Sequence, residues 1–324
     1  MATSYIICTR AVKKDRLIAE PGKTLYLEVP DGALPKPEHA TDQAAWLKKV
    51  LKSASWGAKS LGYVRGDLLI FIHGYNNSTE NVIARHRQLK ADLTAVGFKG
   101  EIISFDWPSA SSALNYQEDR HDAKKTAFQL VSDGISLLSA QQQPDCYINI
   151  HILAHSTGAY VVREAFDDAD DSQLQNSAWR VSQVVFIGGD ISSGSLQTGD
   201  SSSESLYRHC TRLTNYSNLY DSVLKLSNFK RVGIAPRCGR VGLPENRPSK
   251  AVNIDCSDYF FQLDNNPDIK QRDQVNDQLG TFCHSWHIGN LHFARDLFDT
   301  LKGDLDRSVF ATRTEDLNQQ LQLS

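Results

Sequence analysis

The stretch Tyr147-Ile148-Asn149-Ile150-His151-Ile152-Leu153-Ala154-His155-Ser156-Thr157-Gly158 decides the fold of this chain. Its apolar first part predicts a buried β-strand, and the helix-like run 159–166 follows at once. Ser156 is therefore predicted to stand on a sharp corner between strand and helix, with its hydroxyl at the edge of the sheet. Ala154 and Gly158 are small, as a tight corner requires, because a bulky side chain would strike the neighbouring backbone. Such a corner indicates nucleophilic attack by serine.

The corner is a weak signal by itself, because many serines that precede a helix only cap it. A second segment, Leu68-Leu69-Ile70-Phe71-Ile72-His73-Gly74-Tyr75-Asn76-Asn77, supports the chemical interpretation. Its apolar run predicts a strand buried on both faces, which ends in His-Gly and a polar loop. A helix is expected over residues 79–96, with Asn77 or Ser78 as its cap and Gly97 at its end.

A serine hydrolase needs two backbone N–H donors for the oxyanion that forms when serine attacks a carbonyl. One donor comes from the residue after the nucleophile, which is Thr157 here. The other comes from a loop after an earlier strand, and Tyr75 has that place just after His73-Gly74. The two segments together predict an oxyanion hole formed by the N–H groups of Tyr75 and Thr157.

Two downstream segments offer the remaining groups. Acyl transfer at serine needs a histidine that accepts the hydroxyl proton and a carboxylate that orients this histidine. Asp221 follows the strand-like run 212–216 and precedes a short helical run. His284 precedes the last amphipathic run, in which apolar residues recur at helical spacing from Leu291 to Leu301. Serine, acid and histidine thus occur in the order that hydrolases with this serine corner use.

The chain resembles the alpha/beta-hydrolase superfamily, and it is most similar to a bacterial branch of unknown function. The resemblance runs over residues 68–301 and rests on the segments 71–78, Asp106-Trp107-Pro108-Ser109, Ala154-His155-Ser156-Thr157-Gly158, Tyr216-Ser217, Leu224-Lys225-Leu226-Ser227 and His284-Ser285-Trp286. It implies Ser156 as the nucleophile, Asp221 as the acid and His284 as the base. The superfamily more often has glycine in place of Ala154, and many of its members carry alanine.

Rivals remain for the acid and for the base. Asp190 ends another apolar strand, and a few hydrolases take their acid from that earlier strand. His287 lies three residues after His284 and is the alternative base. His155 precedes the nucleophile and is expected to point away from the reaction, whereas His73 is expected to brace the oxyanion loop.

Strand and helix patterns alternate along the 324 residues, which predicts an α/β fold with a mostly parallel central sheet and helices on both faces. We expect a single alpha/beta-hydrolase domain over residues 1–324, with its core at 68–301. Residues 5–12 and 24–29 predict an antiparallel N-terminal strand pair. The irregular, proline-containing stretch 228–280 is expected to cover part of the pocket.

The predicted function is that of a serine hydrolase, a carboxylic ester hydrolase that forms an acyl-enzyme at Ser156. This chemistry needs no metal ion or organic cofactor. A peptidase or an acyltransferase would use the same three residues, and a hydrolase fold without catalysis would serve as a binding or scaffold protein. A serine at this corner argues against haloalkane dehalogenation, which uses an aspartate there.

The composition of the chain limits the classes of binding partner that we expect. The formal net charge of -3 gives no sign of nucleic acid or an anionic membrane, and a small-molecule acyl substrate is expected. No apolar stretch approaches the roughly 18–20 residues of a membrane helix. The first ten residues lack the pattern of a secretory signal, so we expect a cytoplasmic location. The sequence leaves the oligomeric state open.

Overall fold

The computed structural model describes residues 3–56, 64–109, 126–140, 146–170, 179–227, 235–303, 310–318 and 320–324. The strands are β1 (Thr3–Lys13), β2 (Arg16–Pro30), β3 (Ala40–Thr41), β4 (Ser55–Trp56), β5 (Val64–Ile72), β6 (Glu101–Asp106), β7 (Cys146–His155), β8 (Val181–Ile187), β9 (Cys210–Ser217), β10 (Ala251–Asp255), β11 (Arg313–Glu315) and β12 (Leu321–Leu323).

The helices are α1 (Gln43–Ala54), α2 (Thr79–Ala95), α4 (Ser136–Ser139), α5 (Gly158–Asp170), α6 (Ser201–His209), α7 (Ser222–Ser227), α8 (Cys238–Val241), α9 (Ser257–Asn265), α10 (Pro267–Arg272), α11 (Phe282–Ser285) and α12 (Leu291–Lys302). Short 3-10 turns are η1 (Pro37–His39) and η5 (Ser193–Leu196), and η3 (Leu130–Ile135) is a π-helical stretch.

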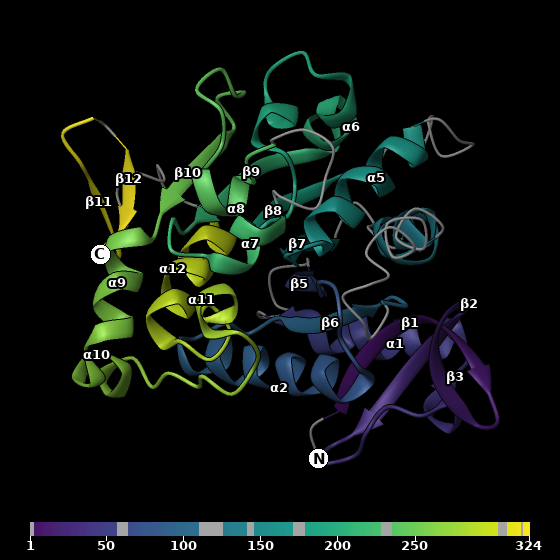
Figure 1. The fold of residues 1–324 in the computed structure, drawn as a ribbon. Coiled ribbons are helices and arrows are strands. Elements are labelled where there is room, and N and C mark those ends of the chain that lie inside the picture. Colours follow the sequence, from purple (N-terminus) through teal and green to yellow (C-terminus); the bar gives the residue numbers. More distant parts are fainter. Residues whose placement is uncertain are drawn as a thin grey trace.

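One sheet runs through the molecule, in the strand order β11-β12-β10-β9-β8-β7-β5-β6-β1-β2-β3, with β4 beside β5 (Figure 1). All neighbours from β12 to β1 are parallel. β2 is antiparallel to β1, which itself pairs with β6 in parallel. The mostly parallel sheet and the antiparallel N-terminal pair confirm the fold class that the sequence predicts.

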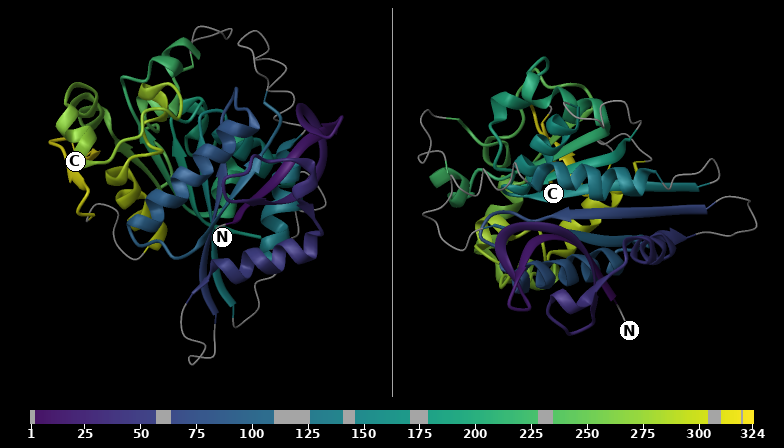
Figure 2. Two further views of the ribbon diagram at one scale, coloured as in Figure 1. Left: turned by 90° about the horizontal axis from the view of Figure 1, so that it is seen from below. Right: turned by 90° about the vertical axis from the view of Figure 1, so that its right-hand side faces the viewer.

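The central strands are buried on both faces, which explains their continuous apolar runs. In β5, Leu68, Ile70 and Ile72 belong to one core cluster, whereas Leu69 and Phe71 belong to the other. Helices α1, α5 and α6 supply side chains to the first cluster, and α2, α9 and α12 supply the second. Figure 2 shows the sheet from two further sides, with helices on both of its faces.

The strand register brings the carboxyl ends of neighbouring strands to the same edge. Ile72 at the end of β5 pairs with Ala154 of β7, and His155 of β7 pairs with Ile187 at the end of β8. The loops that follow these strands therefore meet above one edge of the sheet, where open α/β sheets bind their ligands. Figure 1 looks onto this edge, with α7 and α11 in front of the strands.

Helix α2 follows the first of these loops. The side chain of Ser78 accepts a hydrogen bond from the N–H of Asn81 over 3.3 Å, so Ser78 is the helix cap. The helix ends at Ala95, close to the predicted end, and Gly97 follows with φ +102°. Such a backbone angle favours glycine because it has no side chain to collide with the chain.

The stretch expected to be irregular contains three short helices besides the late strand that its apolar residues 251–254 predict. Residues 228–234 of it lie outside the described residues, and residues 235–280 hold α8, β10, α9 and α10. Strand β10 extends the parallel sheet beside β9. Short elements with weak periodicity have little sequence signal, because tertiary contacts stabilise them.

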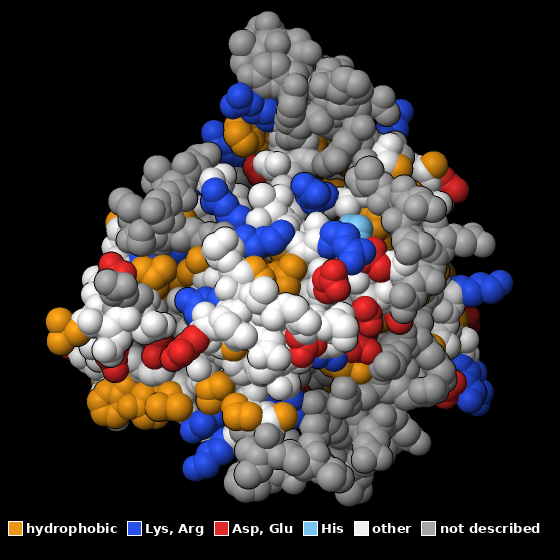
Figure 3. Space-filling model, turned by 90° about the horizontal axis from the view of Figure 1, so that it is seen from above, with side chains coloured by type: hydrophobic (Ala, Val, Ile, Leu, Met, Phe, Trp, Pro, Cys, Tyr) orange, Lys and Arg blue, Asp and Glu red, His pale blue; other side chains and the backbone are white. Residues whose placement is uncertain are grey.

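The surface carries no dominant charge in the view from above. Basic and acidic side chains are interspersed over the described part of this face in Figure 3. This mixture accords with a formal net charge of -3 on the whole chain. Among the described residues, no helix is both long enough and apolar enough to cross a lipid bilayer.

Candidate active site

Ser156 lies on the corner that the sequence predicts, between the last residue of β7 and the first of α5. Its φ of +56° is in the left-handed region, which is strained for a residue with a side chain. Two backbone hydrogen bonds hold the corner, from Ser156 N–H to the Ile187 oxygen over 3.1 Å and from Asp190 N–H to the Ser156 oxygen over 3.0 Å. A side chain on Gly158 would lie 2.5 Å from the Ile72 oxygen, so the corner needs a small residue there.

Asp221 and His284 meet although 63 residues separate them in the sequence. Asp221 lies in the loop between β9 and α7, and His284 lies in α11. The His284 Nδ1 donates to the Asp221 Oδ2 over 2.6 Å, and both side chains are buried. The other carboxylate oxygen, Oδ1, accepts from the N–H of Leu224 over 2.9 Å. With Nδ1 occupied as a donor, Nε2 of His284 is left as the proton acceptor in the neutral ring.

Gly188 connects the serine corner to this pair. It has φ +53°, and a side chain on it would lie 3.1 Å from Cε1 and 3.2 Å from Nδ1 of His284. The short segment 187–190 therefore contacts the His284 ring and also bonds the Ser156 backbone. All three residues that the resemblance implies lie around the carboxyl end of β8.

The rival acid and the rival base have other neighbours. Asp190 Oδ1 lies 3.0 Å from Nε of the fully buried Arg237, in an ion pair. The His287 ring stacks on Trp286, with ring centroids 4.0 Å apart, and meets Phe293 edge to face. Burial holds the pKa of His287 well below its usual value. His287 is therefore a neutral member of an aromatic cluster, and Asp190 is engaged with a cation.

The loop of residues 73–78, the predicted oxyanion loop, packs against Ser156. A side chain on Gly74 would lie 2.6 Å from Cβ and 3.2 Å from Oγ of Ser156, so only glycine allows this approach. The Gly74 oxygen accepts from Nδ2 of Asn77 over 2.9 Å and from Nδ1 of His73 over 2.8 Å. Because the peptide bond is trans, the N–H of Tyr75 points away from these two donors.

A buried polar cluster supports the loop from the neighbouring strands, as the expected role of His73 requires. The Asp106 Oδ1 lies 2.7 Å from Nε of Arg10 and 3.1 Å from Nε2 of His73. Arg10 also donates to the Asn77 oxygen over 2.7 Å. Burial alone would raise the pKa of Asp106, but the Arg10 charge and the His73 contact outweigh burial and lower it. Arg10 of β1 and Asp106 of β6, together with His73 directly after β5, thereby fix the position of the loop.

Sequence reasoning missed two contacts behind His284. The ring of His155 was expected to point away from the reaction, but it contacts the segment that carries His284. Its Nε2 donates to the His284 backbone oxygen over 3.0 Å. From α2, Nε and Nη2 of Arg85 donate to the Leu279 oxygen over 2.9 and 2.6 Å. Burial lowers the pKa of Arg85 to about 10, and no carboxylate pairs with it within the described ranges. These two side chains hold the segment that carries His284.

Metal ligation finds no support in this part of the chain. Within the described residues, no group of three or more His, Cys, Asp or Glu side chains is arranged to hold a metal ion. The polar groups around Ser156 instead form the hydrogen-bonded pair and the braced loop described above.

Comparison with known proteins identifies the class. Residues 49–260, more than half of the chain, match the family model described as alpha/beta hydrolase of unknown function (DUF900). The chain belongs to this family of alpha/beta hydrolases. No curated protein matches it.

Solved structures with similarity to the chain include three microbial enzymes. Lipase B from Aspergillus fumigatus is 13% identical, with 81% of this chain and 59% of that chain covered and a TM-score of 0.43. Phospholipase PlaB from Legionella pneumophila, in complex with thio-NAD, is 15% identical over 50% and 40% of the chains, with a TM-score of 0.30. An esterase from Pyrobaculum calidifontis is 13% identical over 67% and 84%, with a TM-score of 0.32. The chain thus spans less than two thirds of the first two proteins.

Proposed function

We propose that this protein is a serine hydrolase that cleaves carboxylic esters, with Ser156 as the nucleophile, His284 as the base and Asp221 as the orienting acid. The observation that carries the proposal is the buried 2.6 Å contact between Asp221 and His284 beside the strained corner of Ser156. A histidine with this partner, next to a serine held in a left-handed turn, has the chemical requirements for acyl transfer.

The proposed reaction begins when Nε2 of His284 takes the hydroxyl proton of Ser156 as its oxygen attacks the ester carbonyl. Asp221 keeps the imidazole in the Nδ1–H form and stabilises the imidazolium that results. The proton then passes to the leaving alcohol, and an acyl-enzyme remains. Water, activated by the same histidine, releases the acid and restores the serine.

The N–H groups of Tyr75 and Thr157 are proposed to hold the oxyanion. The orientation of the Gly74–Tyr75 peptide supports the first donor, because its oxygen is held by Asn77 and His73 and its N–H faces the other way. Gly74 also lies directly against the Ser156 side chain. One such donor typically lowers the barrier by about 3 kcal/mol.

A fluorophosphonate probe, which modifies activated serines, tests the proposal. We expect covalent labelling of the wild-type chain and none of Ser156→Ala, with equal thermal stability of the two. A matched control is Ser201→Ala, at the exposed start of α6, which should label like wild type. Absence of labelling on folded wild type between about pH 6 and pH 9 would contradict the proposal and favour a binding or scaffold role.

A substrate panel separates ester hydrolysis from related reactions of the same triad. Nitrophenyl esters, short peptides and an acyl donor with an added alcohol acceptor should be compared on the same preparation. We expect turnover of the esters, with release of the free acid. Labelling together with turnover of peptides alone would reassign the protein as a peptidase, and preferred transfer to the alcohol would reassign it as an acyltransferase.

A further inference from the structure

A hollow lies at the edge of the sheet opposite to Ser156. The amino ends of β5 and β7, Trp56 of β4, residues 97–99 after α2 and the final residues of α12 surround a cavity of about 760 Å³. Cavities of this size commonly hold small molecules. None of the residues that line it belongs to the proposed triad or to the oxyanion loop.

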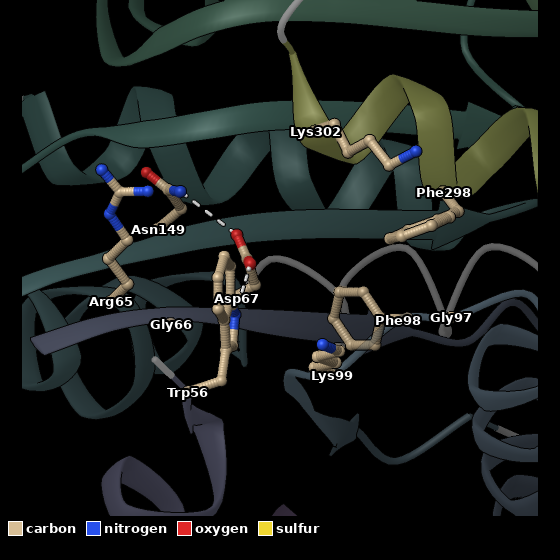
Figure 4. Close-up of a pocket in the computed structure, with 10 residues that line it drawn as sticks. All are labelled: Trp56, Arg65, Gly66, Asp67, Gly97, Phe98, Lys99, Asn149, Phe298 and Lys302. Atoms are coloured by element: carbon tan, nitrogen blue, oxygen red, sulfur yellow. Dashed lines mark hydrogen bonds between the residues drawn. The ribbon is translucent and has the colours of Figure 1, made fainter. Parts of the chain in front are cut away.

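Aromatic side chains form two sides of this cavity. Figure 4 shows Trp56 on one side, and Phe98 and Phe298 on the other. The two phenylalanine rings meet edge to face, with centroids 6.4 Å apart. Trp56 is 38% exposed, whereas the other four tryptophans of the chain are buried. A large apolar ring left open to solvent at a cavity wall offers a surface on which a planar ligand can stack.

Positive charge gathers at the same place. Arg65, Lys99 and Lys302 line the cavity, on a chain whose formal net charge is -3. Lys302 lies over the Phe298 ring, with its nitrogen 4.1 Å from the ring centroid. A local excess of cations in a hollow concentrates anions there, whatever the sign of the whole protein.

The one acid among the described lining residues, Asp67, is already engaged. Its Oδ2 accepts from Nε1 of Trp56 over 3.0 Å, and its Oδ1 accepts from Nδ2 of Asn149 and Nε2 of His151, each over 3.1 Å. These bonds fix the base of the cavity and the Trp56 ring (Figure 4). Lys302 also pairs with Asp299 over 2.8 Å, but this ion pair is partly exposed and such pairs contribute only about 0–1 kcal/mol, so an anionic group can approach Lys99 and Lys302.

We propose that this cavity binds a planar aromatic ligand that carries an anionic group at its edge. The ring lies between Trp56 and the phenylalanine pair, and the anionic group lies beside Lys99 and Lys302. This site is separate from the proposed hydrolase site and carries out no reaction. It goes beyond the proposed function and does not depend on it.

Calorimetric titration of the full-length chain with three probes tests the chemistry of the site. We expect 2-naphthoate to bind, and its neutral isostere 2-naphthamide to bind about tenfold more weakly. Two partly exposed ion pairs together contribute about this factor in affinity. Cyclohexanecarboxylate has the charge without the aromatic ring and should bind about fivefold more weakly. Equal affinity for the acid and the amide would overturn the proposal.

Substitutions of the lining residues test where 2-naphthoate binds. The double variant Lys99→Gln/Lys302→Gln should weaken naphthoate binding about tenfold, and Trp56→Ala about fivefold. The matched control Lys36→Gln/Lys48→Gln removes the same charge elsewhere on the surface and should bind like wild type. Ser156→Ala should also bind like wild type. If Ser156→Ala abolished binding and the double lysine variant retained it, the ligand would bind in the proposed hydrolase site. The proposal would then be wrong.

Discussion

The ring of His155 donates from Nε2 to the backbone oxygen of His284 across 3.0 Å, and the two imidazoles lie 4.7 Å apart. His155, which precedes the proposed nucleophile Ser156, therefore holds His284, the proposed base. Both sit on elements that the segment 187–190 also touches, so the serine corner and the histidine are fixed against one another.

Replacing this donor should slow the reaction without preventing substrate binding. His155→Phe keeps a ring of similar size and removes the hydrogen bond to His284, so the imidazole loses part of its alignment. We expect kcat on a nitrophenyl ester to fall about 10- to 100-fold with KM nearly unchanged. His155→Gln retains a donor and should recover part of the loss. Wild-type kcat in His155→Phe would show that the contact is only structural.

The two candidate acids should respond differently to loss of charge. Asp221→Asn leaves the shape of the site intact and fixes the wrong tautomer of His284, so the labelling rate and kcat should fall about 10³- to 10⁴-fold. Asp190→Asn removes one charge of a buried ion pair with Arg237, so unfolding should become easier by about 3–5 kcal/mol while the folded enzyme keeps its rate.

Denaturant unfolding and probe labelling of the two variants provide the measurements. The reverse pattern, in which Asp190→Asn is inert and Asp221→Asn is merely less stable, would transfer the role of the acid to Asp190. That outcome would also require the His284 ring to turn away from the partner that it has in this structure.

Substitutions at two glycines with left-handed backbones distinguish the effect of backbone strain from the effect of contact with the His284 ring. Gly188→Ala and Gly199→Ala introduce a side chain at φ +53° and +83°, and each should destabilise the fold by about 1–2 kcal/mol. Only the methyl group at position 188 meets the His284 ring, since nothing lies within 4 Å of the one at 199. We expect Gly188→Ala to lose labelling by the probe and Gly199→Ala to keep it. Equal labelling rates would mean that Gly188 does not position the histidine.

Acid should destabilise the protein through its buried histidines. Burial lowers the pKa of His86 to about 3, and it also lowers the pKa of His73, His155 and His287. The unfolded chain takes up these protons near pH 6.5, whereas the folded chain does not, so the unfolded state binds more protons below about pH 6.5. Stability is therefore present above this pH and is lost as the pH falls from about 6.5 towards 3.

His86→Gln isolates one of these groups. Glutamine can keep the hydrogen bond to Ser104 and cannot take up a proton, so the slope of unfolding free energy against pH should shrink by about 1.4 kcal/mol per pH unit in that window. Denaturant unfolding at several pH values gives the slope, and an unchanged slope in His86→Gln would contradict the prediction.

Much of the fold could be predicted from the sequence because its central strands carry continuous apolar runs. The runs before His73 and before Ser156 are long enough to indicate strands that are buried on both faces. Helix α2 was predictable from its cap and its final glycine. The serine corner also had a clear local signal, because small residues surround it at a strand-to-helix junction.

The remainder depends on contacts between distant residues. Nothing near Arg85 predicts that it would bind the Leu279 oxygen, because 194 residues separate them. Nor does the local sequence indicate that Arg313, at the start of β11, lies 2.7 Å from Asp296 of α12 in a buried ion pair. The local sequence pattern specifies helices and strands, whereas the packing of these elements decides which polar side chains come into contact. For the same reason the sequence leaves Asp190 and Asp221 as rivals for one position.

The distribution of the site along the chain has a consequence for its synthesis. Arg10 braces the loop beside Ser156 from the first strand, whereas the imidazole comes from residue 284 of 324. A growing polypeptide that has already formed the serine corner lacks the proposed base until residue 284 has been synthesised. A fragment that stops before this residue is therefore expected to leave a fluorophosphonate probe unreacted.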